Sequence, residues 1–242
     1  MSGANLEEVD WLLEETEPQV SAATRKLRML RSLRCGNKFE RAARAQGATI
    51  IAGVDEVGRG SLFGPVVAAA VILPIDSHIR GLRDSKQLTI PDRERLAGIV
   101  QKKALAIAIE EVCVEIIDRV NIYQATRIAM ASAVTRLSLA ADHLLIDAMR
   151  LDLPHSQTSI IYGDSLSISI AAASVVAKVY RDRRMCELDR EYPGYGLASH
   201  KGYATPQHLD ALERLGPCPL HRKSFRPVMQ TSLLWDDQDR ER

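Results

Sequence analysis

Short β-branched and apolar segments, several of which end at an acidic residue, constrain the fold of this chain most. The segments that we expect to form strands are 49–54, 64–73, 105–114, 143–149 and 159–162. The segments with helical periodicity are 91–103, 117–139, 168–190 and 206–215. Because strands come first and then alternate with helices, the order predicts an α/β fold, a mixed sheet with helices on both faces.

Length and composition set broad limits on the protein. A chain of 242 residues suits one large domain, or one domain with a small appendage. The net charge of +1 neither requires nor excludes a polyanionic partner. The longest apolar run, residues 66–73, is too short to cross a bilayer, and residues 1–19 are acidic and do not resemble a secretory signal. The 4 cysteines form no Cys-x-x-Cys pair, which suggests a reducing compartment. Together with the short apolar run, this predicts a cytoplasmic protein without membrane association.

The two ends of the chain differ in charge from the middle. Residues 1–46 predict a helical N-terminal extension, in which an acidic helix containing Leu6 to Leu13 ends near Pro18. The following stretch is basic through Arg25, Lys26, Arg28, Arg31, Arg34, Lys38, Arg41 and Arg44. It either docks on the main domain as a solvated helix or follows nucleic-acid phosphates. Residues 229–242 are expected to form a charged tail, and its last residues, 236–242, are expected to be frayed.

The acidic residues at the strand ends are the most informative feature for function. Asp55 and Glu56 directly follow an apolar run, Asp147 lies inside another, and Asp164 follows a third. A carboxylate beside a buried strand is costly unless it has a partner. If these strands are neighbours, the four acids converge and raise one another's pKa values.

A hard divalent cation would relieve that repulsion, and carboxylate oxygens favour Mg²⁺ or Mn²⁺. Two such ions about 3.5–4 Å apart can clamp the attacking and leaving oxygens of a phosphodiester. The alternative is that Asp164 caps the following helix and Asp147 joins a local ion pair. The spacing of the acids in the sequence fits a metal site and these structural roles equally well.

Several polar loops could contact a nucleic acid. The glycines of Gly58-Arg59-Gly60 permit close approach of a ligand to the backbone, or they form an ordinary turn. Lys86, Lys178 and Lys201 could reach phosphates or solvent. Tyr203 could stack on a sugar or base, or pack on the surface.

Taken together, these motifs resemble the ribonuclease HII family. The resemblance spans residues 47–228, in order and at the family's spacing. It is carried by Gly53-Val54-Asp55-Glu56-Val57-Gly58-Arg59-Gly60, the run from Gly64 to Leu73, Asp84-Ser85-Lys86, Asn121-Ile122, Asp147, Gly163-Asp164, Ser169 to Ser174, Ala177-Lys178-Val179, Arg181-Asp182-Arg183, Tyr192-Pro193, His200-Lys201-Gly202-Tyr203 and His221 to Phe225. Phe39-Glu40-Arg41 resembles the N-terminal extension of some bacterial members.

The resemblance implies a ribonuclease H-like fold, a mixed five-stranded sheet flanked by helices. It implies that the catalytic, metal-binding carboxylates are Asp55, Glu56, Asp147 and Asp164. It further implies that Gly58, Arg59 and Gly60 read the 2′-hydroxyl of a ribonucleotide, that Tyr203 stacks on the sugar at the RNA-to-DNA step, and that Lys86, Lys178 and Lys201 meet phosphates. The expected substrates are RNA–DNA hybrids and DNA duplexes containing ribonucleotides, and the expected state is a monomer.

Two departures from the family's pattern bear on substrate fit. Ser61-Leu62-Phe63 stands where many members have Pro-Leu-Ala, and Ala148 follows Asp147 where Gly is frequent. Neither changes an expected metal ligand. The competing functions are another two-metal nuclease of the same fold and a hybrid-binding module without catalysis.

Overall fold

The computed structural model describes residues 21, 24, 29 and 32–240. The expected acidic helix between Leu6 and Leu13 lies outside the described residues, as do Arg25, Lys26, Arg28 and Arg31. Contacts divide the chain into two units, Met1–Leu33 and Arg34–Arg242. All the candidate site residues belong to the second unit.

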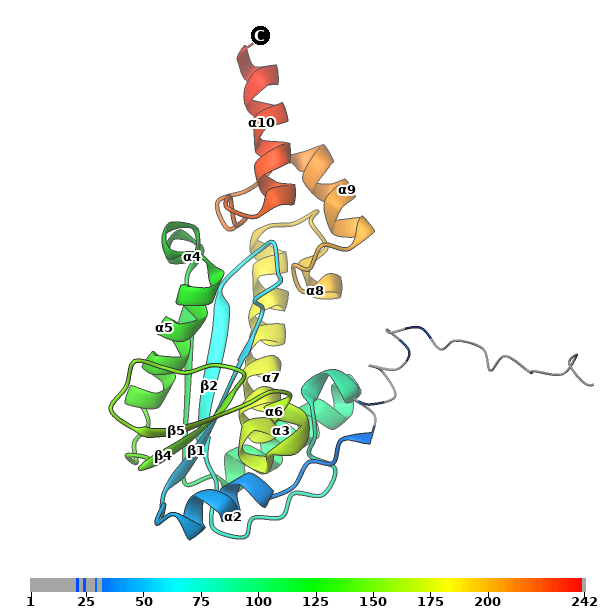
Figure 1. Ribbon diagram of the computed structural model, residues 1–242. Coiled ribbons are helices and arrows are strands. Elements are labelled where there is room, and N and C mark those ends of the chain that lie inside the picture. The colour runs from blue at the N-terminus through cyan, green and yellow to red at the C-terminus, as the bar shows by residue number, and fades with distance from the viewer. Residues whose placement is uncertain (1–20, 22–23, 25–28, 30–31, 241–242) are drawn as a thin grey trace, which may run out of the picture. The chain divides into compact units, whose positions relative to one another are not determined.

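The second unit contains a five-stranded sheet with the strand order β3-β2-β1-β4-β5 (Figure 1). The strands are β1 (Ile51–Val57), β2 (Val66–Ile72), β3 (Ala106–Val112), β4 (His143–Asp147) and β5 (Ser156–Ile160). Pairing is antiparallel between β1 and β2 and between β2 and β3, and it is parallel between β1 and β4 and between β4 and β5. The sequence prediction of an α/β fold with a mixed sheet is therefore confirmed.

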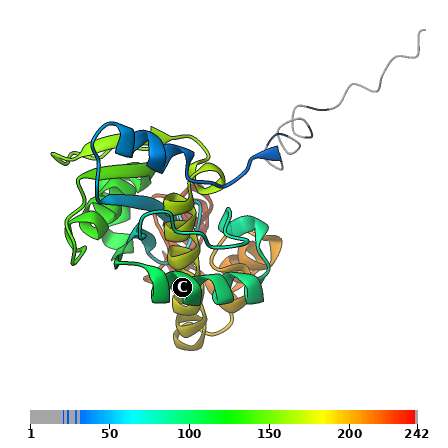
Figure 2. The ribbon, with the colours of Figure 1, turned by 90° about the horizontal axis from the view of Figure 1, so that it is seen from below.

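Helices cover both faces of this sheet (Figures 1 and 2). The helices are α2 (Lys38–Ala45), α3 (Ile90–Lys103), α4 (Val114–Val120), α5 (Ile122–Thr135), α6 (Gly163–Leu166), α7 (Ile168–Glu191), α8 (Leu197–His200), α9 (Pro206–Leu215) and α10 (Arg226–Arg240). Side chains of a strand alternate between faces. Ala68 and Ala70 of β2 therefore join the core beneath α5, whereas Val67 and Ala69 pack with α3 and α7.

Capping residues set where the main helices begin. The side chains of Thr89, Asn121, Ser167 and Thr205 accept hydrogen bonds from main-chain N–H groups in the first turns of α3, α5, α7 and α9, respectively. Each bond satisfies a donor that the helix itself leaves without a partner. No helix in the described part of the chain is both long and apolar enough to serve as a bilayer span.

Three sequence predictions differ from the observed elements. The strand expected over 159–162 is observed as β5 over Ser156–Ile160, so it begins three residues earlier and ends two residues earlier. The single helix expected over 117–139 is wrong, because Asn121 adopts a positive φ of 70° and separates α4 from α5. A helical period alone does not reveal such a break, since both segments present apolar residues at compatible spacing. At the C-terminus, α10 continues as helix to Arg240, through most of residues 236–242, which were predicted to be frayed.

Helix α7 lies unusually close to β1, and this contact places the candidate site. A side-chain carbon at Gly53 would lie 2.1 Å from the main-chain carbon of Ser169. Only glycine permits that approach. The start of α7 consequently packs directly on the first half of β1, and Asp55 and Glu56 follow Gly53 by two and three residues along the same strand.

Candidate metal centre and substrate cleft

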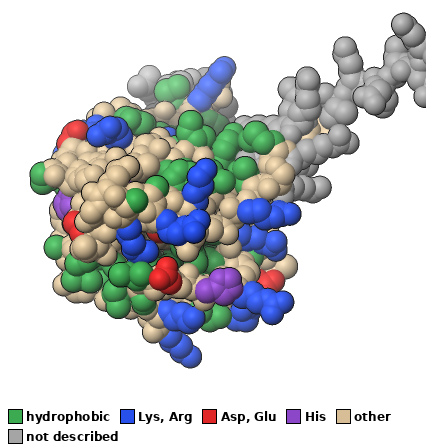
Figure 3. All heavy atoms as spheres, turned by 60° about the horizontal axis from the view of Figure 1, so that its bottom comes forward, with side chains coloured by type: hydrophobic (Ala, Val, Ile, Leu, Met, Phe, Trp, Pro, Cys, Tyr) green, Lys and Arg blue, Asp and Glu red, His purple; other side chains and the backbone are tan. Residues whose placement is uncertain are grey.

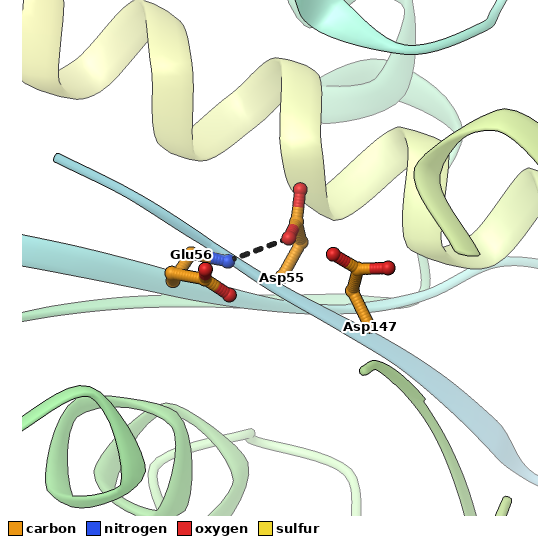
Figure 4. A group of neighbouring side chains, drawn as sticks. All are labelled: Asp55, Glu56 and Asp147. Atoms are coloured by element: carbon orange, nitrogen blue, oxygen red, sulfur yellow. Dashed lines mark hydrogen bonds between the residues drawn. The ribbon is translucent and has the colours of Figure 1, made fainter. Parts of the chain in front are cut away.

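Neighbouring parallel strands bring Asp55 and Asp147 to the same place. Val54 of β1 pairs with Ile146 of β4, so the next residue of each strand is an acid on the face toward α7. Glu56 follows at the end of β1. One oxygen from each of Asp55, Glu56 and Asp147 lies within 4.8 Å of the others (Figure 4). Three of the four predicted metal ligands thus converge.

Asp164, the fourth predicted ligand, lies beside this group but has its own partner. It is in the single turn of α6 and is buried, and its Oδ2 lies 3.5 Å from Nζ of Lys86. The alternative role as a helix cap is wrong for Asp164, because Ser167 caps α7. Asp147 accepts a hydrogen bond of 2.7 Å from the main-chain N–H of Gly163, which ties the two acidic positions together.

Burial and mutual repulsion raise the pKa values of these acids. Burial raises the pKa of Asp55 well above its usual range, and the charges of Glu56 and Asp147 raise it further. Burial, followed by the nearby charge of Asp84, raises the pKa of Asp164 to about 6. For Glu56, burial raises the pKa although Arg59, with its guanidinium 3.2 Å away, opposes the shift. Ionising these buried, neighbouring carboxylates is therefore unfavourable in free energy, and a bound cation would reduce that unfavourable free energy.

The donor set fits a hard divalent cation. Every side-chain ligand in the group is a carboxylate oxygen, the type that Mg²⁺ and Mn²⁺ prefer. Glu56 Oε2 is buried without a hydrogen-bond partner among the described residues. A buried acceptor without a protein partner is uncommon in folded proteins and can be satisfied by water, a ligand or an ion. A cation bound here would satisfy that oxygen.

A cleft of about 600 Å³ opens beside Glu56. Its lining includes six of the predicted substrate-contacting residues, namely Gly58, Arg59, Gly60, Lys86, Lys178 and Tyr203. The seventh, Lys201, lines a separate pocket of about 350 Å³ and donates hydrogen bonds to the carbonyl of Ala198 and to the sulfur of Cys186. The cleft thus joins the acidic group to the glycine loop and the tyrosine.

Lys86 and Lys178 line the cleft from two different elements, a short 3-10 helix and α7. The Asp84-Ser85-Lys86 turn is a short 3-10 helix, η1 (Ser85–Gln87), whose Ser85 hydroxyl contacts that of Ser174 on α7 at 2.9 Å. Lys178 is mostly buried and forms an ion pair of 2.6 Å with Asp182. Lys86 is therefore the more accessible of the two cations.

Two fully buried arginines, whose role was not predicted from the sequence, hold the loops that line the cleft. Arg181 donates hydrogen bonds to the carbonyls of Phe63, Pro65 and Lys201. Arg222 donates to the carbonyls of Arg59 and Gly64. The available signal was helical spacing, because Arg181 lies one turn from buried positions 177 and 185 of α7.

Tyr203 is fixed by its main chain as well as by its ring. It forms an isolated antiparallel bridge with Ser61, and its carbonyl lies 3.0 Å from Nδ1 of His208. The guanidinium of Arg181 lies 5.8 Å from the centre of the ring. Phe63, which stands where many members of the family have alanine, is fully buried and packs with Met185 and Leu188.

A mixed sheet with carboxylates at the ends of adjacent strands, opening into a cleft lined by basic residues and a tyrosine, defines a metal-dependent nuclease of the ribonuclease H-like class. The sequence model of ribonuclease HII matches residues 52–228. A ribonuclease HII of Koribacter versatilis (strain Ellin345) is 54% identical over 213 residues, which cover 88% of this chain and 84% of the relative. A ribonuclease HII of Bacillus cereus (strain AH820) is 56% identical over 192 residues, covering 79% of this chain and 75% of the relative.

Solved structures agree on the fold. The crystal structure of ribonuclease H2 from Pyrococcus horikoshii OT3 superposes with a TM-score of 0.67 at 23% identity, covering 78% of this chain and 99% of that one. The chain belongs to the ribonuclease HII family. It is accordingly a metal-dependent endoribonuclease, from a family that acts on RNA–DNA hybrids.

Proposed function

We propose that this enzyme hydrolyses the RNA strand of RNA–DNA hybrids and cuts on the 5′ side of ribonucleotides embedded in a DNA duplex. The products would carry 3′-hydroxyl and 5′-phosphate ends. The observation that supports this most is the group formed by Asp55, Glu56 and Asp147, whose oxygens lie within 4.8 Å of one another beside a cleft lined by Gly58, Gly60 and Tyr203.

Asp55, Glu56, Asp147 and Asp164 would hold two Mg²⁺ or Mn²⁺ ions, which when bound activate the attacking water and stabilise the departing 3′-oxygen. The chain's own contribution is to orient these oxygens. Gly163 donates to Asp147, and Arg59 pairs with Glu56, so neither carboxylate rotates freely. Such outer contacts set the direction and basicity of metal ligands.

The cleft would distinguish ribose from deoxyribose. Main-chain groups of Gly58-Arg59-Gly60 would contact the 2′-hydroxyl, the group that separates RNA from DNA. Tyr203 would stack against the sugar at the RNA-to-DNA step, while Lys86, Lys178 and Lys201 would meet phosphates. On the face shown in Figure 3, Lys and Arg side chains are spread among few acidic ones, which suits a polyanionic partner.

The decisive experiment compares three labelled duplexes of one sequence: all DNA, an RNA–DNA hybrid, and DNA with a single ribonucleotide. Each is incubated with Mg²⁺, with Mn²⁺, and with chelator. We expect cleavage of the second and third only, with the single-ribonucleotide duplex cut at one position, immediately 5′ of the ribonucleotide. Ligation of the 5′-phosphate product tests the chemistry of the ends. Cutting of the all-DNA duplex would identify another nuclease of this fold, and binding of the hybrid without metal-dependent cutting would identify a binding module.

The remaining assignments are proposals of the same kind. Residues 1–46 would form a helical extension, 47–228 the catalytic domain with its C-terminal helices, and 229–242 a charged tail. The protein would act as a monomer in the cytoplasm, which is consistent with its four free cysteines. Sedimentation with and without the hybrid tests the oligomeric state, and a stable dimer would contradict it.

A further inference from the structure

We propose that Glu40 is a positioning residue for the metal centre: its buried carboxylate fixes the junction between α6 and α7 and thereby orients Asp164 and Asp147. The inference rests on the proposed function of those two acids as metal ligands. It assigns a role to a residue outside the region 52–228 that the family's sequence model covers.

Glu40 makes two hydrogen bonds to the start of α7. Its Oε1 accepts a hydrogen bond of 2.6 Å from the hydroxyl of Ser167 and one of 3.0 Å from the main-chain N–H of Ser169. Glu40 is 4% exposed, so these bonds are shielded from water. A carboxylate at the N-terminus of a helix also interacts favourably with its dipole, here that of a helix of 24 residues. Through Glu40, helix α2 is consequently hydrogen-bonded to the first turn of α7.

A second set of contacts holds the same junction from the main chain. Gly36 forms a parallel bridge with Ser167, in which the N–H of Gly36 donates to the carbonyl of Leu166 and the N–H of Ile168 donates to the carbonyl of Gly36. The segment that leads into α2 therefore pairs with the residues between α6 and α7. Two independent contacts, one from a side chain and one from the backbone, fix this short connection.

The junction is linked directly to the proposed metal ligands. The N–H of Ser167 donates to the carbonyl of Gly163 at 2.8 Å, and the N–H of Gly163 donates to Oδ1 of Asp147 at 2.7 Å. Asp164 is the next residue along the same single turn. A continuous series of hydrogen bonds thus runs from Glu40 through Ser167 and Gly163 to Asp147, and Asp164 moves with it.

The consequence is that losing the Glu40 contacts should loosen two metal ligands without touching the substrate cleft. Removing an outer contact of a metal site typically weakens metal affinity or activity about 10- to 100-fold. None of the residues that line the cleft belongs to α2. The effect should therefore appear in metal affinity and kcat and not in the KM for the hybrid.

The test uses the full chain with Glu40→Ala, Glu40→Gln and, as a matched control, Ala43→Gly. In Glu40→Gln, the amide carbonyl oxygen could still accept both hydrogen bonds, so this variant is the conservative rescue. Ala43 is buried on the same helix and packs with Ile51 and Leu145, so its substitution weakens α2 without touching Ser167. For each variant, the Mn²⁺ concentration that gives the half-maximal rise in melting temperature is measured without substrate, together with kcat and KM.

For Glu40→Ala we expect the half-maximal Mn²⁺ concentration to rise about 10-fold and kcat at limiting Mn²⁺ to fall to a similar degree, with KM within about 2-fold. For Glu40→Gln, the half-maximal Mn²⁺ concentration and kcat should stay near the wild-type values. Ala43→Gly should lower the melting temperature without changing the Mn²⁺ concentration. Equal losses in Ala43→Gly and Glu40→Ala, or an unchanged metal response in Glu40→Ala, would overturn the proposal.

A second variant and a readout without substrate complete the test. If Glu40→Ala does not fold, Ser167→Gly removes the hydroxyl that donates to Glu40 and that also accepts from the main-chain N–H of Ile170. Glycine is tolerated as a helix cap, so we expect this variant to fold and to show a smaller change in the same direction. An unchanged metal response in Ser167→Gly would then count against the proposal. Failure of the wild type to cut any hybrid would refute the proposed function, whereas the melting response to Mn²⁺ tests the role of Glu40 without any cleavage.

Discussion

Lys86 reaches from the solvent to a buried acid, with its Nζ 3.5 Å from Oδ2 of Asp164. The side chain of Lys86 is 76% exposed and that of Asp164 is 8% exposed. Partial burial alone would lower the pKa of Lys86, but the negative charges of Asp164 and Asp55 raise it overall. The lysine therefore supplies part of the positive charge that a divalent cation would bring.

Replacing Lys86 with methionine should make the protein depend more on metal for stability. Without Lys86, the acids keep their mutual repulsion and lose a counter-charge, so the metal-free melting temperature should fall. The rise in melting temperature on adding Mn²⁺ should be larger than in the wild type, as measured by calorimetric scans. Lys102→Met, at an exposed position of α3, is the control. Equal Mn²⁺ responses in all three proteins would contradict the role of Lys86.

The response to Mn²⁺ should depend on pH, because the pKa of Asp164 is raised from 3.8 to about 6 by burial and then by Asp84. A raised pKa means that folding favours the protonated acid. This contribution is fully present below about pH 3.8 and is lost as the pH rises through about 6, which amounts to up to about 3 kcal/mol.

Metal binds the ionised acid, so the Mn²⁺-induced rise in melting temperature should be small at pH 5 and large at pH 8. In the metal-free state, the stability of the wild type relative to Asp164→Asn should decline over the same window. Denaturant unfolding at several pH values measures this difference. A Mn²⁺ response of equal size at pH 5 and pH 8 would argue against Asp164 as a ligand.

The two glycines of the loop should respond differently to alanine. Gly58 has a φ of +90°, and an added carbon would lie 2.2 Å from Nε of Arg181, so Gly58→Ala should lose at least about 2 kcal/mol of stability. Gly60 is exposed, and the nearest atom to an added carbon is in the Tyr203 ring at 3.9 Å.

Gly60→Ala should therefore fold like the wild type, within about 0.5 kcal/mol. Its added methyl group lies in the cleft, so it should raise the KM for a single-ribonucleotide duplex. Denaturant unfolding and steady-state kinetics on both variants check the pair. Unchanged kinetics for Gly60→Ala would show that the substrate does not approach this backbone closely.

Ala148 carries strain next to a proposed metal ligand. It adopts a left-handed φ of 48°, where a residue with a side chain is disfavoured by about 1–2 kcal/mol. Glycine would relieve this strain, and its greater freedom in the unfolded chain would offset part of the gain. Ala148→Gly should therefore stabilise the fold by about 0.5–1 kcal/mol and leave cleavage intact, as unfolding and activity measurements can establish. A loss of stability would mean that the alanine methyl group makes a compensating contact.

The sequence predicted much of this site because strand ends are local features. Asp55 and Glu56 follow an apolar run, Asp147 lies inside another, and a parallel β1–β4 pair brings the three acids together. Contacts between distant segments were not predictable in this way. The hydrogen bond from Ser167 to Glu40 joins residues 127 positions apart, and the buried arginines bond to carbonyls, which all residue types possess. Helical periodicity could predict that Arg181 is buried, but it could not predict which carbonyl groups Arg181 binds.

The central claim is that carboxylates from separate strands meet and bind the ions that support hydrolysis, and Asp147→Asn tests it most directly. Asparagine keeps an oxygen to accept the hydrogen bond from Gly163 but removes the charge. Cleavage of a single-ribonucleotide duplex with Mn²⁺ should fall at least about 100-fold, while hybrid binding stays within about 2-fold. Cleavage at close to the wild-type rate would contradict the account.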